Sequence, residues 1–391
     1  LLDNIFYTSN STFDQRISRA KPEVGDLIIT REAPMGEVCI IPEGVDCCLG
    51  QRMVLIKPDL KKVDKQFLLY ALLSDYSQTQ IQQSNGTGSI VSNLRIPVLK
   101  ALKVPNLQLS AQKFIGKTLG AIDKKIELNN KINKELETVA KLIYEYWFVQ
   151  FDFPDTSGKP YKSSGGKMIY NETLKREIPD GWDINSLSDW IGSDKTGDWG
   201  KESEQGNYVF QVDCIRGTDL NGLNGKGKIE SPNRFILKNN KNKQLTPFDL
   251  IVEISGGSPV QSTGRIAYLT VESFERFDHP LICSNFCKAI SLTNNNYFYN
   301  FVYQWNAIYD NGILFGWEGK TSGIKNLLFD SFVNTYKVCI PPEHIAKKFY
   351  SLIKPLELKK QKALKENFEL ESLRDWLLPM LMNGQISVED Q

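Results

Sequence analysis

The sequence has few histidines, no excess of either charge and no long apolar run. Two His in 391 residues make a Ser-His-Asp or Cys-His catalytic arrangement a poor fit. Lys and Arg number 47 against 46 Asp and Glu, so net charge identifies no partner and any basic surface must be local. No apolar run reaches the roughly 18 residues of a membrane span, and no signal peptide is visible. We therefore predict a cytoplasmic protein with no membrane partner.

Motifs for catalysis and cofactor binding are also missing. No GxxxxGK[ST] loop is present, and the only Pro-Pro pair, Pro341-Pro342, does not belong to the Asn/Asp-Pro-Pro-aromatic motif of adenine methylation. The seven Cys are odd in number and irregularly spaced, which argues against a disulfide framework. Cys283 and Cys287 lack the second close pair or the nearby His of a zinc site. We predict no catalytic residue, no cofactor and no metal site.

The pattern along the chain alternates between globular sequence and long helices. Residues 24–56 read as strands broken by turns, and residues 65–83 as a helix. A long helix is expected over 110–148, with Ser110 as its N-cap, and a second over 343–378, ending before Pro379. The predicted segments are a first globular domain (1–107), a first spacer helix (108–150), a linker rich in Gly, Pro, Ser and Lys (151–177), a second globular domain (178–340), and a second spacer helix with the C-terminal tail (341–391).

The first long helix carries a coiled-coil pattern. Its two seam positions repeat with an average period of 3.5 residues. They are Ile115, Ile122, Asn129, Leu136 and Ile143, and Leu119, Ile126, Asn133, Ala140 and Trp147. The pattern predicts a long partner helix.

The two halves of the chain match at an offset of 234 residues, which places Ile115 on Phe349 and Thr87 on Thr321. Upstream, with a few residues of slippage, "GDLIIT" (25–30) resembles "FDLIVE" (248–253). The second repeat has more sequence before this element than the first, so we expect the first domain to be N-terminally incomplete. The duplication predicts an α+β fold: two globular domains separated by two long antiparallel coiled-coil helices.

Two similar domains on an antiparallel helix pair have the geometry with which two-fold proteins read two half-sites on DNA. Here the family is recognisable: the chain resembles the DNA-specificity (S) subunits of type I restriction–modification systems. The resemblance covers nearly the whole chain and is clearest in residues 86–154, in "IPDGWDINSLSDW" (178–190) and in "SLRDWLLPMLMNGQI" (372–386).

The resemblance implies a non-catalytic, DNA-binding subunit. Each globular unit would be a target-recognition domain that reads one half of a bipartite, asymmetric site on double-stranded DNA, and the helices would set the spacer. Two methyltransferase (M) subunits would dock along the helices, and restriction/motor (R) subunits would complete the complex. Adenine methylation and ATP-dependent cleavage would belong to those partners.

Amides interrupt the apolar seam near its centre. An Asn at a seam position lowers stability but fixes the register of a coiled coil. We interpret Asn129, Asn133 and the repeat partner Asn367 as register residues where the helices cross. Contact with a partner helix, or exposure to solvent, are the alternatives.

Candidate DNA contacts lie mainly in the second globular domain. Region 216–243 has seven basic residues against two acidic ones, a local charge suited to phosphate contacts. Loops 258–265 and 319–326 add side chains of the types that read base edges, and 84–95 is the counterpart of the latter in the first domain. The candidates are Arg216, Thr218, Asn221, Lys226, Lys228, Lys238, Lys241, Gln261, Arg265, Lys320, Thr321, Lys325, Thr87, Ser89 and Asn93.

Two other functions remain open from the sequence. The chain could be the recognition half of a fused methyltransferase-nuclease, or a scaffold that binds no DNA and works through its helix pair. A methylation motif in a longer native chain would favour the first, and loss of sequence-specific DNA retention in the purified complex would favour the second.

Overall fold

The computed structural model describes residues 5–83, 93–258, 260–321 and 324–386. The chain forms two compact units. The first unit combines residues 1–128 with 367–391, and the second unit contains residues 129–366. Two long helices contribute to both: α5 (Leu109–Tyr144), which continues as a π-helical turn over Glu145–Val149, and α9 (Glu343–Met382). Within the described ranges, no helix has the length and apolarity needed to cross a membrane.

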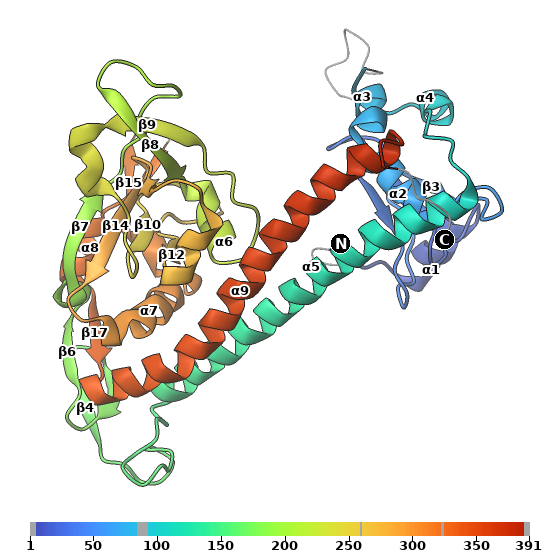
Figure 1. Ribbon diagram of the computed structural model, residues 1–391. Helices are drawn as coiled ribbons and strands as arrows, with labels where there is room; N and C mark the ends of the chain where they lie inside the picture. Colours follow the sequence, from blue (N-terminus) through green and yellow to red (C-terminus); the bar gives the residue numbers. More distant parts are fainter. Residues whose placement is uncertain (1–4, 84–92, 259, 322–323, 387–391) are drawn as a thin grey trace. The chain divides into compact units, whose positions relative to one another are not determined.

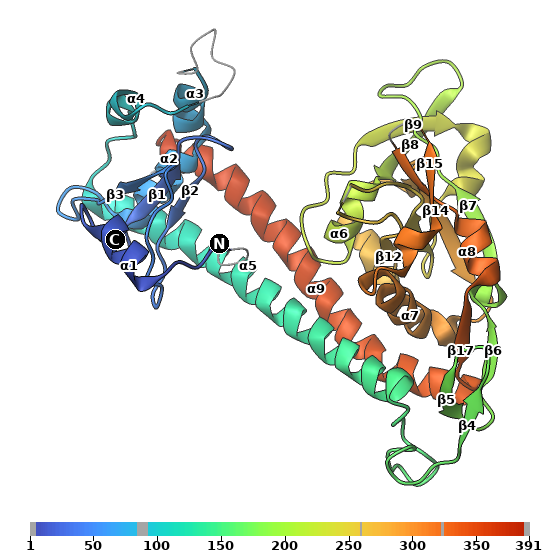
Figure 2. The same ribbon diagram turned by 180° about the vertical axis from the view of Figure 1, so that it is seen from behind.

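The first unit is built on a three-stranded antiparallel sheet. Its order is β2 (Val38–Ile40), β1 (Leu27–Thr30), β3 (Met53–Ile56), with Leu27 opposite both Ile40 and Ile56. Figure 2 shows this sheet beside α2 and the first turns of α5. The shorter helices are α1 (Asn10–Ile17), α2 (Lys65–Leu73), α3 (Asp75–Gln83) and α4 (Ile96–Ala101).

The single helix predicted over 65–83 is wrong, because the structure breaks it at Ser74. Ser74 has an extended backbone (φ −65°, ψ 152°), its hydroxyl donates to the carbonyl of Ala71, and its own carbonyl accepts from the first turn of α3. A short polar side chain that bonds to nearby backbone groups commonly ends a helix in this way. The two helices can therefore take different directions.

The second unit contains several small sheets. They have the orders β12-β10-β14-β7, β13-β8-β9, β11-β16-β15, β17-β6 and β4-β5 (Figure 1). The strands are β4 (Met168–Asn171), β5 (Arg176–Pro179), β6 (Asp183–Ser186), β7 (Ile191–Thr196), β8 (Tyr208–Ile215), β9 (Asn233–Leu237), β10 (Leu250–Glu253), β11 (Ser255–Gly256), β12 (Ile266–Tyr268), β13 (Leu281–Cys283), β14 (Cys287–Leu292), β15 (Glu318–Thr321), β16 (Ile324–Leu327) and β17 (Lys337–Ile340). The short helices are α6 (Leu220–Leu223), α7 (Phe298–Asp310) and α8 (Phe329–Thr335).

An aromatic core holds the second unit together. Trp190, Phe301 and Trp305 are buried in it, and so are Phe151 and Phe153 of the segment expected to be a linker. Burying aromatic side chains contributes a large share of core stability. Residues 151–177 therefore pack as part of the second unit, where they also supply β4.

The duplication seen in the sequence has a structural counterpart. In each unit a central strand, β1 or β10, pairs antiparallel with β2 and β3 or with β12 and β14. The long helices begin at Leu109 and Glu343, which are 234 residues apart. Among the described residues of the first unit, no strand corresponds to the β13-β8-β9 sheet.

Within each unit the two long helices run antiparallel. In the first unit, Ile115 and Leu119 of α5 share a core with Leu381 and Met382 at the end of α9, while Asp123 pairs with Arg374. In the second unit, Phe349 near the start of α9 packs on Trp147 near the end of the α5 segment. The seam predicted from the heptads is the face that each unit buries.

The start of the first predicted helix and the end of the second differ slightly from the structure. Ser110 lies inside α5 and not at its N-cap. α9 continues through Pro379 to Met382, and Gly384, with φ +68°, follows its end. Proline lacks a backbone N–H and so removes one helical hydrogen bond. The helix nevertheless continues for about one further turn, so the missing hydrogen bond does not end it at Leu378.

The amides of the seam are buried. Asn129 is 2% exposed, and its Nδ2 donates to Glu366 Oε2 of α9 at 2.8 Å. Asn133 is 4% exposed, and in the described part of the chain its side-chain amide has no hydrogen-bond partner. Asn367 is buried as well. Because these amides are buried, exposure to solvent does not explain why they lie in the seam. A role in fixing the register of the two helices remains our proposal.

Asn133→Leu should raise the free energy of unfolding by about 1 kcal/mol, because a buried amide without a partner costs roughly that much or more. Asn129→Leu removes a hydrogen-bond partner of the Glu366 carboxylate and should therefore lower the free energy of unfolding. Urea denaturation of both variants would measure the difference. A loss of stability in Asn133→Leu equal to that in Asn129→Leu would contradict this reading of the seam.

Candidate nucleic-acid interface

Two loops of the second unit meet at Glu253, the last residue of β10. Its buried carboxylate accepts from Arg265, with Nη2–Oε1 at 2.6 Å and Nε–Oε2 at 2.9 Å. A Cβ atom at Gly217 or Gly256 would lie only 2.9 or 2.8 Å from Glu253 Oε1. Gly256, the last residue of β11, has φ +138°, a conformation that favours glycine. Loops 216–222 and 255–265 therefore approach the same carboxylate.

The β15–β16 hairpin reaches the same region. β11 pairs with β16, with Ser255 opposite Asn326. The Thr263 backbone N–H donates to Glu318 Oε1 at 2.8 Å, and Lys325 Nζ lies 2.9 Å from Glu318 Oε2. The structure thus brings together the described residues of three segments, 216–222, 258–265 and 319–326, that the sequence singled out separately.

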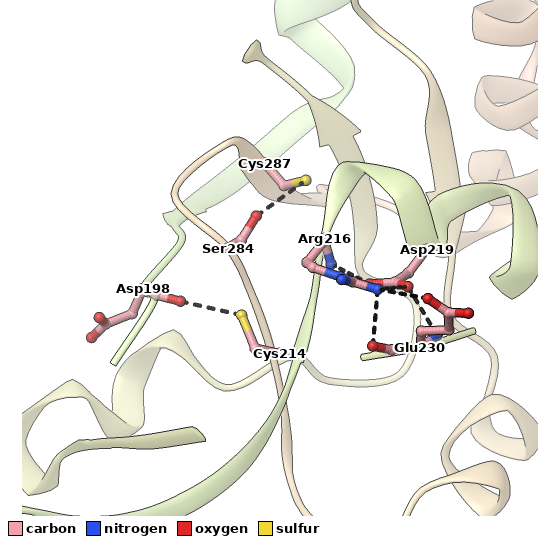
Figure 3. A network of polar contacts seen from close by, with 7 residues as sticks. All are labelled: Asp198, Cys214, Arg216, Asp219, Glu230, Ser284 and Cys287. Carbon is pink, nitrogen blue, oxygen red and sulfur yellow. Dashed lines mark hydrogen bonds and ion pairs between the residues drawn. The ribbon is translucent and has the colours of Figure 1, made fainter. Parts of the chain in front are cut away.

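Two of the predicted base-reading residues are engaged inside the protein. Arg216 bonds to Asp219 through Nε at 2.9 Å and Nη2 at 3.0 Å, and to the carbonyl of Glu230 (Figure 3). Burial alone would raise the pKa of Asp219, but hydrogen bonds from Arg216 and the Glu230 backbone outweigh it and leave the pKa lowered. Arg265 is bound by Glu253 in a similar way. Both guanidinium groups hold loops in place, and we do not propose them as base contacts.

Other predicted contacts also have partners in the protein. Lys226 Nζ lies 2.6 Å from Glu137 of α5, and Lys325 pairs with Glu318. In the first unit, Asn93 accepts from Arg31 Nη2 at 2.9 Å and donates to Glu32. These pairs reduce the case for DNA contact, since each cation or amide already has a nearby partner.

The remaining candidates differ in exposure. Solvent-exposed ones are Thr218, Asn221, Lys228, Lys238 and Lys241, and Gln261 is half-buried. Lys241 Nζ also lies 4.2 Å from the centroid of the Phe210 ring. Thr87 and Ser89 lie outside the described residues, and so do the side chains of Lys320 and Thr321.

A row of polar side chains that the sequence analysis missed lies across β8 and β9. Gln211 Nε2 donates to Asn233 Oδ1 at 2.9 Å, and Asn233 Nδ2 lies 3.3 Å from Asp213 Oδ1 and 3.0 Å from His279 Nδ1. Gln and Asn are well suited to read adenine, because an amide both donates and accepts. Only the register, which places Gln211 opposite Phe235 and Asp213 opposite Asn233, shows that they share one face.

Three cysteines of this unit, Cys214, Cys283 and Cys287, are buried free thiols. Cys214 contacts the carbonyl of Asp198 at 3.5 Å, and Ser284 contacts Cys287 Sγ at 3.9 Å (Figure 3). Burial raises the pKa of Cys214 and of Cys283 to about 12, so these thiols are not nucleophiles at neutral pH. The described residues contain no group of His, Cys, Asp and Glu placed to hold a metal ion.

Helix α5 and the π-helical turn that follows it have a second apolar seam in the second unit. Ile132, Val139 and Tyr146 lie seven residues apart, and Leu142 and Val149 repeat the spacing three residues later. All five are exposed. An exposed apolar heptad stripe on a helix is the pattern of a helix–helix interface.

Comparison with known proteins agrees with these features. A family model described as "Type I restriction modification DNA specificity domain" matches residues 4–138. The MjaIX specificity subunit of a type I restriction enzyme from Methanocaldococcus jannaschii is 27% identical over 94% of this chain and 78% of its own length. The putative MjaX specificity subunit from the same organism is 34% identical over 30% of this chain and 27% of its own length. The crystal structure of a type I S subunit from M. genitalium has a TM-score of 0.54 at 18% identity, over 94% of this chain and 84% of that chain.

Proposed function

Because the chain belongs to the family of type I restriction-modification DNA specificity subunits, we propose that its two globular parts read the two halves of a bipartite, asymmetric DNA site. As a specificity subunit the chain is non-catalytic and works in a restriction–modification complex on DNA. The observation that carries the proposal is the duplicated strand order, β2-β1-β3 and β12-β10-β14, with each copy in the same unit as part of the two long helices. Different loops on the same framework fit two different half-sites.

The chemistry belongs, in this proposal, to partner subunits. Two methyltransferase subunits would dock on the helices and methylate adenine, and restriction/motor subunits would add ATP-dependent cleavage. The seam on α5 and its π-helical turn supports docking, because it is exposed, apolar and at heptad spacing in the sequence; its residues are Ile132, Val139, Leu142, Tyr146 and Val149. Such a seam would be buried by a partner helix.

For the half-site that the second unit reads, we propose that different residues contact the phosphates and the bases. Lys228, Lys238 and Lys241 are exposed cations suited to phosphate. Gln211, Asn233 and Gln261, with Thr218 and Asn221, have donors and acceptors suited to base edges. Arg216 and Arg265 would hold the loops that carry some of these groups.

Replacing Lys238 and Lys241 together by Ala should weaken binding about equally on all sequences. It should also reduce the slope of log K against log salt by roughly one unit per lysine, because each lost phosphate contact releases about one counterion fewer. The assay is binding of cognate and single-base-variant duplexes by the complex with its methyltransferase subunits at several salt concentrations.

Lys159→Ala is the matched control, since Lys159 is exposed on the 151–177 segment and has no proposed role in DNA binding. It should leave the slope unchanged. An unchanged slope in the Lys238/Lys241 variant would show that this loop region does not face DNA, and the readout surface would then be sought elsewhere in the unit.

A further inference from the structure

Each long helix carries a carboxylate at an equivalent repeat position, and each carboxylate accepts from a tyrosine of the adjoining globular part. Asp123 lies on α5 and Glu357 on α9, 234 residues apart, the same offset that separates the starts of the two helices. Tyr70 OH lies 2.5 Å from Asp123 Oδ2 within the first unit. Tyr268 OH lies 2.9 Å from Glu357 Oε2 within the second unit.

The two tyrosines come from different elements. Tyr70 lies on α2, whereas Tyr268 ends β12, and the residue 234 positions after Tyr70 is Gln304. The carboxylate that accepts the bond therefore occupies the same helix position in both repeats, whereas the tyrosine that donates it comes from a different element in each. The strand order that the two units share therefore does not explain why each unit contains a bond from a tyrosine to a helix carboxylate.

Further bonds complete each site. In the first unit, the second carboxylate oxygen of Asp123 accepts from Arg374 Nη1 of α9 at 2.9 Å. In the second unit, Gln361 Nε2 donates to Glu357 Oε1 at 2.7 Å, and Lys360 Nζ donates to Tyr268 OH at 3.1 Å. The first site thus joins a globular part to both long helices, and the second joins a globular part to α9, through hydrogen-bonded groups.

Bonds of this kind define orientation more strictly than apolar packing does. Tyr70 is 3% exposed, and Tyr268 and Glu357 are 7% and 5% exposed. Burial, and then the adjacent carboxylate, raise the pKa of both hydroxyls, so they remain donors. A rotation of the globular part on its helix would separate donor from acceptor. It would leave the buried tyrosine hydroxyls and the buried Glu357 carboxylate without these partners, which costs free energy, whereas the Asp123 side chain is 38% exposed. Apolar side chains in the same place would tolerate sliding.

We propose that Asp123 and Glu357 are positioning residues that set the orientation of each recognition domain on its helix, and thereby the spacer length between half-sites that the complex accepts. This inference rests on the proposed function, because it requires a bipartite site.

The test uses the full chain assembled with its methyltransferase subunits. Duplexes carry both cognate half-sites with the native spacer or with one base pair added or removed. Tyr70→Phe and Tyr268→Phe each remove only the donor hydroxyl. In each variant the preference for the native spacer should fall roughly two- to tenfold, the range expected for one lost hydrogen bond. Discrimination against single-base changes within each half-site should stay unchanged.

Tyr161→Phe is the control, because it removes a hydroxyl bond to the Lys167 carbonyl within the 151–177 segment and touches neither carboxylate. It should keep the wild-type spacer preference. The inference is overturned if Tyr70→Phe and Tyr268→Phe also keep that preference, or if they only lower the melting temperature and weaken binding on all duplexes alike. A wild-type complex that shows no sequence preference would instead overturn the proposed function itself.

Discussion

Phe349→Ala should lower the free energy of unfolding of the second unit by about 3–5 kcal/mol, as is usual when a large core aromatic is truncated. Phe349 is 0% exposed on α9. Its ring centroid lies 4.9 Å from that of Phe148, 5.8 Å from that of Trp147 and 6.1 Å from that of Tyr144. Removing the ring leaves a cavity among aromatic side chains that cannot easily collapse.

Urea denaturation followed by tryptophan fluorescence would measure this change, since Trp147 lies beside the mutated residue. Leu352→Ala is the matched control: it lies three residues later on α9 and is 43% exposed, so it should cost well under 1 kcal/mol. Equal effects of the two substitutions would show that the buried face of α9 is not the one described here.

Glu253→Ala should destabilise the second unit by about 3–5 kcal/mol, because it leaves the Arg265 guanidinium without its partner in a buried site. Glu253 also lies beside Gly217 and Gly256, so loops 216–222 and 255–265 both pack close to its side chain. The sequence preference in one half-site should weaken with the loss of stability.

Replacing both partners, Glu253→Met with Arg265→Met, should recover much of the stability, because no buried charge is then unpaired. Thermal or urea denaturation of the two single variants and the double variant would give the coupling energy. If the double variant is as unstable as the sum of the single ones, the pair is not coupled and the loops are held by other contacts.

The long helices and the duplication could be predicted from the sequence because heptads and a fixed offset are local, periodic signals. The resemblance to type I specificity subunits, drawn from the same segments, is confirmed by the comparisons. The break at Ser74 was missed because neither Gly nor Pro occurs within 65–83, and the bond from the Ser74 hydroxyl to the Ala71 carbonyl has no sequence signature. The role of Phe151 and Phe153 was missed because a segment rich in Gly, Pro and Ser reads as a linker although its aromatics are buried.

The candidate interface was predicted only in outline. Local positive charge indicated a phosphate-binding surface in 216–243, but charge does not distinguish a free arginine from a paired one. The sequence does contain the residue that pairs with Arg216, because Asp219 follows it three residues later. The row Gln211, Asn233 and His279 has no sequence signature, because its members are joined by the register of β8 and β9 and by a distant loop.

The most direct test of the proposed function is the methylation pattern that the intact complex leaves on host DNA, read by single-molecule sequencing. We expect methylated adenines in one bipartite, asymmetric motif: two different specific half-sites separated by a non-specific spacer of fixed length. An uninterrupted or palindromic motif, or methylation without any motif, would contradict it.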